Sequence, residues 1–319
     1  MRKFCIIAIL MFVLIGCEKS IEIPRQEIGF ASQVSRSVVD ETADLYESGI
    51  TLFGTVSLDN DEIIPLFDAE EPEKLYYNSS VGDWCYDNTK YWVPQAVHRF
   101  CALWPYDTNR NCSFTYTDQL ATVSFDHTTS ASGADLLYTT VTRDLVNSED
   151  YSPVSLSFHH ACAALQFNII NASKTDISEV NDIYLVGLYN IGTFSFSTDG
   201  TAGWVLDNPP VASSDTFGGT KLTNLQIDIN KKHSLYSDGA ILVLPQNIAN
   251  TDVAFHVTIT RSGSITAEEK KTIKLGKLGG STPVKWEAGK KYEYTMTVKE
   301  DEIVSNVSVI PWVDHYVDL

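Results

Sequence analysis

The stretch Tyr292–Val298, YEYTMTV, has an aromatic or aliphatic residue at every second position and a polar residue between each pair. Side chains of a β-strand alternate between the two faces of a sheet, so this pattern predicts a strand with one buried and one solvated face. Val253–Ile259 and Leu225–Ile229 show the same alternation. Shorter apolar runs bounded by turn-forming residues predict further strands at 50–56, 91–104 in two pieces, 121–125, 154–168, 183–189, 241–244 and 303–312. The sequence therefore predicts an all-β protein.

The length and charge limit the organisation and the partners. The chain has 319 residues, of which 44% are hydrophobic, and the number of predicted strands exceeds what one small sandwich needs. A polar stretch at 171–176 predicts a boundary between domains at 37–172 and 173–319, although a hairpin loop within one domain would look the same. The net charge of −18 repels phosphate backbones, so nucleic acid is not an expected partner.

The N-terminus is typical of an exported protein. Residues 1–16 begin with Arg2 and Lys3 and continue with an apolar run of 12 residues, which predicts a signal peptide and is too short for a stable membrane span. Leu14–Cys17, LIGC, looks like a bacterial lipobox, which predicts acylation of the Cys17 thiol; the alternative is an ordinary signal peptide with a chance cysteine. Acylation would anchor the mature chain in a membrane outside the cytoplasm.

No motif for catalysis, cofactor binding or a metal is present. The common hydrolase, zincin and nucleotide-binding motifs are absent, so we expect no enzyme activity and no cofactor. His159 and His160 would point to opposite faces of a strand, which predicts one buried and one exposed histidine and no shared metal. The acidic clusters at 59–62 and 68–71 read as solvated turns, with a loop calcium site as the open alternative.

Cysteines and aromatic residues leave two further questions open. The four cysteines after Cys17 could form disulfides in an oxidising compartment or remain buried thiols: Cys85, Cys101, Cys112 and Cys162. The aromatic residues between 76 and 106 are interpreted as core, with stacking on sugar rings as the alternative. A glycoside hydrolase would need a pair of carboxylates close in space, and the sequence offers no pair to name.

Several motifs, taken in order along the chain, resemble the fimbrillin family of type V pilus subunits and anchors in Gram-negative anaerobes. They are the lipobox, the segment Ile28–Phe30 followed by Arg36, the stretch Ile50–Gly54, the pair Tyr91-Trp92 followed by His98–Pro105, the strand Leu156–Leu165 and the hairpin Trp286–Tyr294. The resemblance covers nearly the whole mature chain. It implies two transthyretin-like β-sandwich domains in tandem and a surface-exposed outer-membrane lipoprotein that serves as a structural subunit or anchor of fimbriae and supports adhesion.

The resemblance also implies a mode of assembly. An arginine-specific protease would cut between Arg36 and Ser37, with Arg25 as the less favoured position, and so remove the lipidated segment 17–36 with its strand at 28–34. The opened groove would accept a strand from another pilus subunit, and the candidate donor is 302–319, which includes Val307, Val309 and Trp312. The alternatives are an ordinary last strand at 302–319, an uncut Arg36 that leaves the protein as a lipidated anchor, and a surface lipoprotein that binds glycans or host proteins without polymerising.

Overall fold

The computed structural model describes residues 26–33, 47–58, 62–68, 72–106, 112–116, 119–126, 135–207, 225–236, 240–249, 251–263, 268–278 and 285–312. Strands make up nearly all the regular structure in these ranges, with a short 3₁₀ helix η1 (Leu275–Lys277). The prediction of an all-β protein is confirmed. No helix in the described ranges is long and apolar enough to cross a membrane.

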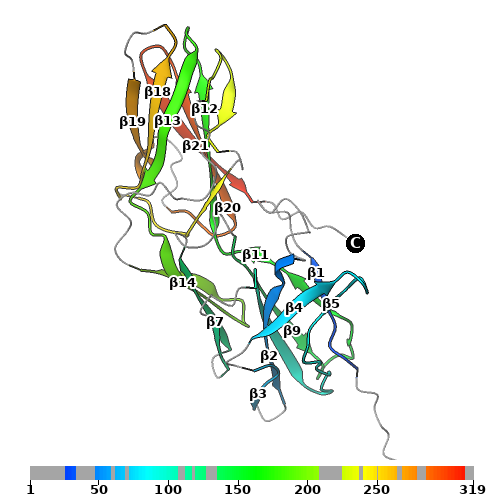
Figure 1. Cartoon of the computed structure of the whole chain (residues 1–319). Coiled ribbons are helices and arrows are strands. Elements are labelled where there is room, and N and C mark those ends of the chain that lie inside the picture. The colour runs from blue at the N-terminus through cyan, green and yellow to red at the C-terminus, as the bar shows by residue number, and fades with distance from the viewer. Residues whose placement is uncertain are drawn as a thin grey trace, which may run out of the picture.

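The strands form two lobes placed end to end (Figure 1). The upper lobe packs two sheets face to face around one core, in which Phe167 stacks on Phe255 of the opposite sheet with ring centroids 4.2 Å apart. The first sheet has the order β16 (Lys232–Ser234), β12 (Ala163–Asn171), β20 (Lys290–Val298), β21 (Ile303–Pro311), and β17 (Ile241–Val243) also pairs with β12. The second sheet has the order β13 (Ile177–Val186), β18 (Ala254–Arg261), β19 (Glu268–Lys274).

The lower lobe is built around a central sheet that is covered on both faces. Its order is β11 (His159–His160), β9 (Leu137–Asp144), β6 (Val97–Trp104), β2 (Ile50–Ser57), β4 (Glu73–Asn78), β5 (Asp83–Cys85), and β3 (Ile63–Pro65) pairs with β2. One face is covered by the pair β1 (Phe30–Gln33) and β10 (Val154–Ser157). The other face is covered by a sheet of order β15 (Ala202–Leu206), β14 (Ile191–Ser197), β8 (Leu120–Asp126), β7 (Cys112–Thr115).

Strand β2 shows why the central sheet needs cover on both sides. The strand is apolar along most of its length, and every residue of it except Ser57 is buried. Leu52 and Phe53 are adjacent and therefore point to opposite faces, where each joins a different hydrophobic cluster. Burial of side chains on both faces is typical of a strand that lies between two layers.

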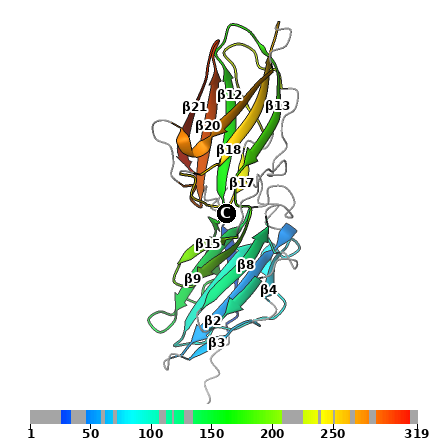
Figure 2. The same cartoon turned by 90° about the vertical axis from the view of Figure 1, so that its left-hand side faces the viewer.

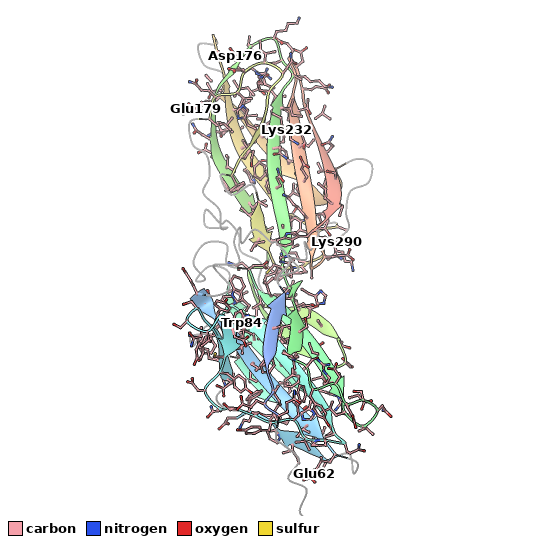
Figure 3. The ribbon with its side chains drawn as sticks, turned by 90° about the vertical axis from the view of Figure 1, so that its right-hand side faces the viewer. Glu62, Trp84, Asp176, Glu179, Lys232 and Lys290 are labelled. Atoms are coloured by element: carbon pink, nitrogen blue, oxygen red, sulfur yellow. The ribbon has the colours of Figure 1, made fainter. Side chains whose placement is uncertain are left out.

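The two lobes share a core where they meet. In β12, Leu165 packs into the core of the upper lobe, whereas the neighbouring Ala164 packs into a cluster that also contains Phe194 of the lower lobe. β17 repeats the pattern with Ile241 and Leu242. Figure 3 shows Lys290, the first residue of β20, close to this junction, and Glu62 at the far end of the lower lobe. The junction is thus a packed apolar contact.

The strand pairing crosses the predicted domain boundary at residues 172 and 173. β12 precedes that boundary but lies in the upper lobe beside β20, whereas β14 and β15 follow it and pair with β8 in the lower lobe. Each predicted span therefore contributes strands to both lobes. The division into two tandem sandwich domains at these residues stays a prediction.

Three expected strands differ from the structure. In the first piece of 91–104, only Tyr91 pairs, in an isolated bridge with Glu27. The stretch 225–229 forms only an isolated bridge between Ile227 and Ile177, because the chain turns at Ile229 and Asn230. Asn230 has a φ of 59°, a left-handed conformation that asparagine tolerates better than most residues. The expected strand at 154–168 is divided into β10, β11 and the beginning of β12, so that one apolar run serves three sheets.

A buried histidine in β6 makes the stability of this fold depend on pH. The His98 side chain has no exposed surface, and its Nε2 accepts a hydrogen bond from the Val93 amide at 3.2 Å. Burial lowers the pKa of His98 from 6.5 to about 4. Between those values the unfolded chain binds a proton that the folded chain does not, so stability present above pH 6.5 is lost as the pH falls toward 4.

We predict that protonation at His98 costs about 3 kcal/mol of unfolding free energy over this interval. The variant His98→Gln retains an acceptor for the Val93 amide but cannot take up the proton. Denaturant unfolding at a series of pH values should therefore show a flatter profile for the variant between pH 6.5 and 4. Parallel profiles for the two proteins would contradict this assignment.

Candidate functional site: the first strand and its groove

The predicted lipidation site precedes the first described strand in the sequence, and the predicted cleavage site follows it. Cys17, Arg36 and Ser37 lie outside the described residues. The strand expected at 28–34 is present as β1. Together with residues 26–29 before it, β1 lies in a groove between residues 90–92 and β10. The geometry of residues 26–33 is therefore the part of the predicted site that the structure describes.

Backbone hydrogen bonds hold this segment on two sides. On one side, the Ile28 amide donates to the Lys90 carbonyl at 2.9 Å, and the Trp92 amide donates to the Gln26 carbonyl at 3.0 Å. On the other side, β1 pairs in parallel with β10, and the Val154 amide donates to the Gly29 carbonyl at 2.8 Å. The segment is thus inserted between two parts of the chain that lie far from it in sequence.

Two apolar side chains of the segment fill the groove. Ile28 and Phe30 are two positions apart, so they point to the same side, and they are only 1% and 2% exposed. The Phe30 ring makes edge contacts with Phe100 at 5.4 Å and with Tyr86 at 5.6 Å between centroids. Ala31, the residue after Phe30, points the other way and is exposed. The groove therefore accepts large apolar residues at alternate positions.

A tyrosine hydroxyl satisfies a further backbone group in the groove. The Tyr86 hydroxyl donates to the Ile28 carbonyl at 2.8 Å. Burial raises the pKa of Tyr86, so the hydroxyl keeps its proton and remains a donor at neutral pH. Because Tyr86 belongs to the lower-lobe scaffold, this donor would remain in place for any other strand in the same position.

β10 depends on β1 for its hydrogen bonding. Among the strands that the structure describes, β1 is the one partner of β10. Without β1, the groove would expose Phe100 and Val154, which are now completely buried, together with unpaired backbone groups of β10 and of residues 90–92. Open backbone groups beside an apolar surface are costly in water and form a template for another strand.

The candidate donor at 302–319 is occupied within its own chain. Residues 303–311 form β21, which pairs in antiparallel register with β20 over its full length. Val307 packs partly against the upper core, whereas Val309 is 46% exposed. Residues 313–319 lie outside the described part.

Trp312 fixes the end of β21 to the lower lobe. Its ring stacks on that of His160, with centroids 3.7 Å apart and planes 7° from parallel. His160 and Asp135 are both buried, and the imidazole Nδ1 is hydrogen-bonded to the Asp135 carboxylate. His159 is exposed, so the prediction of one buried and one exposed histidine is confirmed. The partnership of Trp312, His160 and Asp135 has no local signal in the sequence, because it joins three segments far apart in the chain.

Other candidate chemistry has a simpler structural role. No cluster of three or more His, Cys, Asp or Glu side chains arranged to hold a metal occurs in the described ranges, although the acidic loops are described only in part. Cys85 and Cys101 are free thiols, and burial raises the pKa of Cys101 to about 12. Trp84, Trp92, Phe100 and Trp104 are buried, which confirms the core interpretation for these residues.

A cavity of about 370 Å³ opens between the lobes. Its walls include the rings of Tyr138, Phe194 and Trp204 and the polar side chains of Gln246 and Lys285. The Gln246 amide is already engaged by backbone groups of Tyr189 and Leu244. The cavity therefore has the size of a small-ligand site, but the polar groups identified in it serve the fold.

The groove leads to a first stability prediction. Replacing Phe30 with Ala should lower the unfolding free energy by about 3–5 kcal/mol, because a fully buried ring is lost from a preformed slot. Ala31→Ser, on the exposed side of the same strand, is the matched control and should change the free energy by less than about 0.5 kcal/mol. Denaturant unfolding measures both, and equal effects would show that β1 is not seated as described.

The stacking of Trp312 leads to a second prediction. Trp312→Leu keeps an apolar side chain but loses the parallel stack on His160, so it should cost about 0.5–1.5 kcal/mol beyond the change in buried area. Trp312→Phe should recover most of that loss. A double-mutant cycle with His160→Leu isolates the pair, and a coupling free energy near zero would contradict the contact.

Comparisons with known proteins agree with this architecture. The family model described as fimbrillin-like matches residues 58–312. A fimbrial protein from Bacteroides vulgatus has a similar solved structure, with 17% identity, a TM-score of 0.63 and coverage of 90% of this chain and 99% of that one. Candidate cell adhesion proteins from Bacteroides uniformis and Bacteroides ovatus are similar with TM-scores of 0.54, each at 15% identity; they cover 90% and 91% of this chain, and 100% and 98% of their own chains. No curated protein matches the chain. Because the family model spans most of the sequence, the chain belongs to the fimbrillin-like family.

Proposed function

We propose that this protein is a structural subunit or anchor of fimbriae on the outer surface of a Gram-negative cell, with no catalytic activity of its own. Membership of the fimbrillin-like family supports this assignment, as does the similar fold of a protein described as fimbrial. The observation that carries the proposal is the first strand. Residues 26–33 fill a groove between Lys90–Trp92 and β10, and noncovalent contacts with distant segments hold them there.

The proposed pathway begins with export and lipidation. The signal peptide 1–16 is removed, and acyl chains on Cys17 anchor the protein in the outer membrane. An arginine-specific protease then cuts between Arg36 and Ser37. Because β1 ends at Gln33, this cut lies on the C-terminal side of the strand and separates it from the rest of the chain together with the lipid. Only the contacts in the groove then retain it.

The vacant groove would be filled by a strand from another subunit. The incoming strand must run parallel to β10 and place large apolar side chains two positions apart, as Ile28 and Phe30 do. In the proposed donor, 302–319, the last residues have this spacing at Val317 and Leu319. Donation from Val307 and Val309 would first require β21 to leave β20 and Trp312 to leave His160.

The same cleavage site also explains how the protein would serve as an anchor. If Arg36 is not cut, the chain keeps its lipid and its own first strand, so its groove stays closed. Such a subunit cannot accept a donor strand but can still provide one. The difference between a polymerising subunit and a terminal anchor therefore depends on one peptide bond.

Substitution of the cleavage residue tests the proposal. Protein from the cell surface should begin at Ser37 and lack lipid, and it should form ladders that resist SDS. Arg36→Ala and Arg36→Lys should both keep the lipidated N-terminus at Cys17 and lose the ladders. Arg25→Ala is the matched control and should behave as the parent chain. Intact mass measurement and gel electrophoresis give both readouts, and ladders that persist with an intact lipidated N-terminus would refute strand exchange.

A further inference from the structure

Strand β21 presents an open edge that differs in charge from the two edges of the facing sheet. β21 is the last strand of its sheet, and no other described strand pairs with its outer side (Figure 2). Its nine residues, IVSNVSVIP, carry no charge. By contrast, both edges of the facing sheet carry charge: β19 has the sequence EEKKTIK, in which five of seven residues are charged, and β13 contains Glu179 and Asp182. Charged residues protect an edge strand from pairing with another chain, and β21 lacks this protection.

The backbone groups on the outer edge of β21 follow from its pairing with β20. The Lys299 amide donates to the Glu302 carbonyl at 2.8 Å, and the two strands continue in register without a bulge. Hydrogen-bonded pairs alternate along an antiparallel ladder, so the even-numbered residues of β21 bond to β20. The N–H and C=O groups of Ile303, Ser305, Val307 and Val309 therefore point away from the sheet.

The side chains on the solvent face are also exposed and apolar at both ends of the strand. Val304 and Ile310 are 41% and 39% exposed, and the polar residues Asn306 and Ser308 lie between them. Val307 faces the other way, toward the core. The solvent face of β21 is thus apolar at each end and polar in the middle.

We infer that the outer edge of β21 pairs with β21 of a second copy of this chain, antiparallel and across a two-fold axis through Val307. A two-fold axis perpendicular to the sheet keeps the core faces of both copies on the same side. In this register, Val304 lies opposite Ile310 of the second copy, and Asn306 lies opposite Ser308 of the second copy. On the solvent face, apolar residues then meet apolar residues and polar residues meet polar ones, which favours cross-strand pairing. On the other face, Ser305 lies opposite Val309 of the second copy.

Charge selects the antiparallel orientation. Three consecutive acids, Glu300–Glu302, precede β21. In a parallel pair these acids would lie side by side and repel one another, whereas in the antiparallel pair they lie at opposite ends of the interface. Because the strand itself is uncharged, the protein's net charge of −18 opposes the contact only from a distance and is screened by salt. This contact leaves the groove of β1 untouched and keeps β21 on β20, so it is compatible with a donor strand at Val317 and Leu319 and competes with donation from Val307 and Val309.

Disulfide trapping tests the register on the protein in intact cells. Val307 is the one position of β21 that would lie directly opposite itself, and facing residues of an antiparallel pair are close enough for a disulfide. After oxidation, Val307→Cys should give a dimer of twice the chain mass on a non-reducing gel. Ile310→Cys, on the same strand but away from the axis, is the control and should give at least fivefold less dimer.

A second substitution distinguishes edge pairing from chance collision. Val304→Lys with Ile310→Lys, added to the Val307→Cys chain, places charges on the exposed face of the interface without entering the core, and the dimer should be lost. Val205→Lys, at a 69% exposed position on the edge strand β15, should leave the dimer unchanged. Equal surface amounts of each variant establish folding. Equal trapping at Val307 and Ile310, or trapping that survives both lysines, would overturn the inference.

Discussion

The parallel pair of β1 and β10 is the contact that closes one face of the central sheet in the lower lobe. A parallel pair cannot be closed by a tight turn, so its two strands must come from segments far apart in the chain. Here β1 comes from the first described residues, and β10 follows most of the lower-lobe strands. β1 is therefore added to a scaffold that the rest of the chain builds.

The scaffold around the groove is held by layers that do not involve β1. β2 is buried on both faces, and its cluster on the side away from β1 continues through β12 and β17 into the upper lobe. The residue that follows β21 also joins the two lobes, because Trp312 stacks on His160 of the lower lobe. Loss of β1 would therefore open one face of the central sheet while the other face and the junction between the lobes keep their packing.

The sequence predicts those features that local patterns encode. Period-two alternation identifies β18 and β20, and shorter apolar runs bounded by turn-forming residues identify β2 and β21. Alternation fails at 225–229, where a turn at Asn230 limits the pairing to one bridge. It also cannot assign strands to lobes. β14 and β15 follow the polar stretch at 171–176 yet pair with β8, because sheet membership depends on contacts distant in the sequence.

The candidate site was likewise predictable from the sequence only in part. The short segment with Ile28 and Phe30 could be identified as a strand through its resemblance to a known family, and its burial agrees with that interpretation. The groove that receives it could not be identified, because Tyr86 and Trp92 lie in the connection between β5 and β6, whereas Val154 comes from a segment far along the chain. The stack of Trp312 on His160 also escapes sequence reasoning, since neither residue carries a local signal for the other.

Hydrogen exchange at the Val154 amide tests the central claim most directly. This amide donates to the Gly29 carbonyl across the β1–β10 pair. The account predicts slow exchange in the intact chain, fast exchange in a monomer trimmed at Arg36 from which the strand has dissociated, and slow exchange again in fimbriae assembled from chains that begin at Ser37. An amide that stays protected in the trimmed, strand-free monomer would show that β10 does not depend on β1, and strand replacement at this groove would then be excluded.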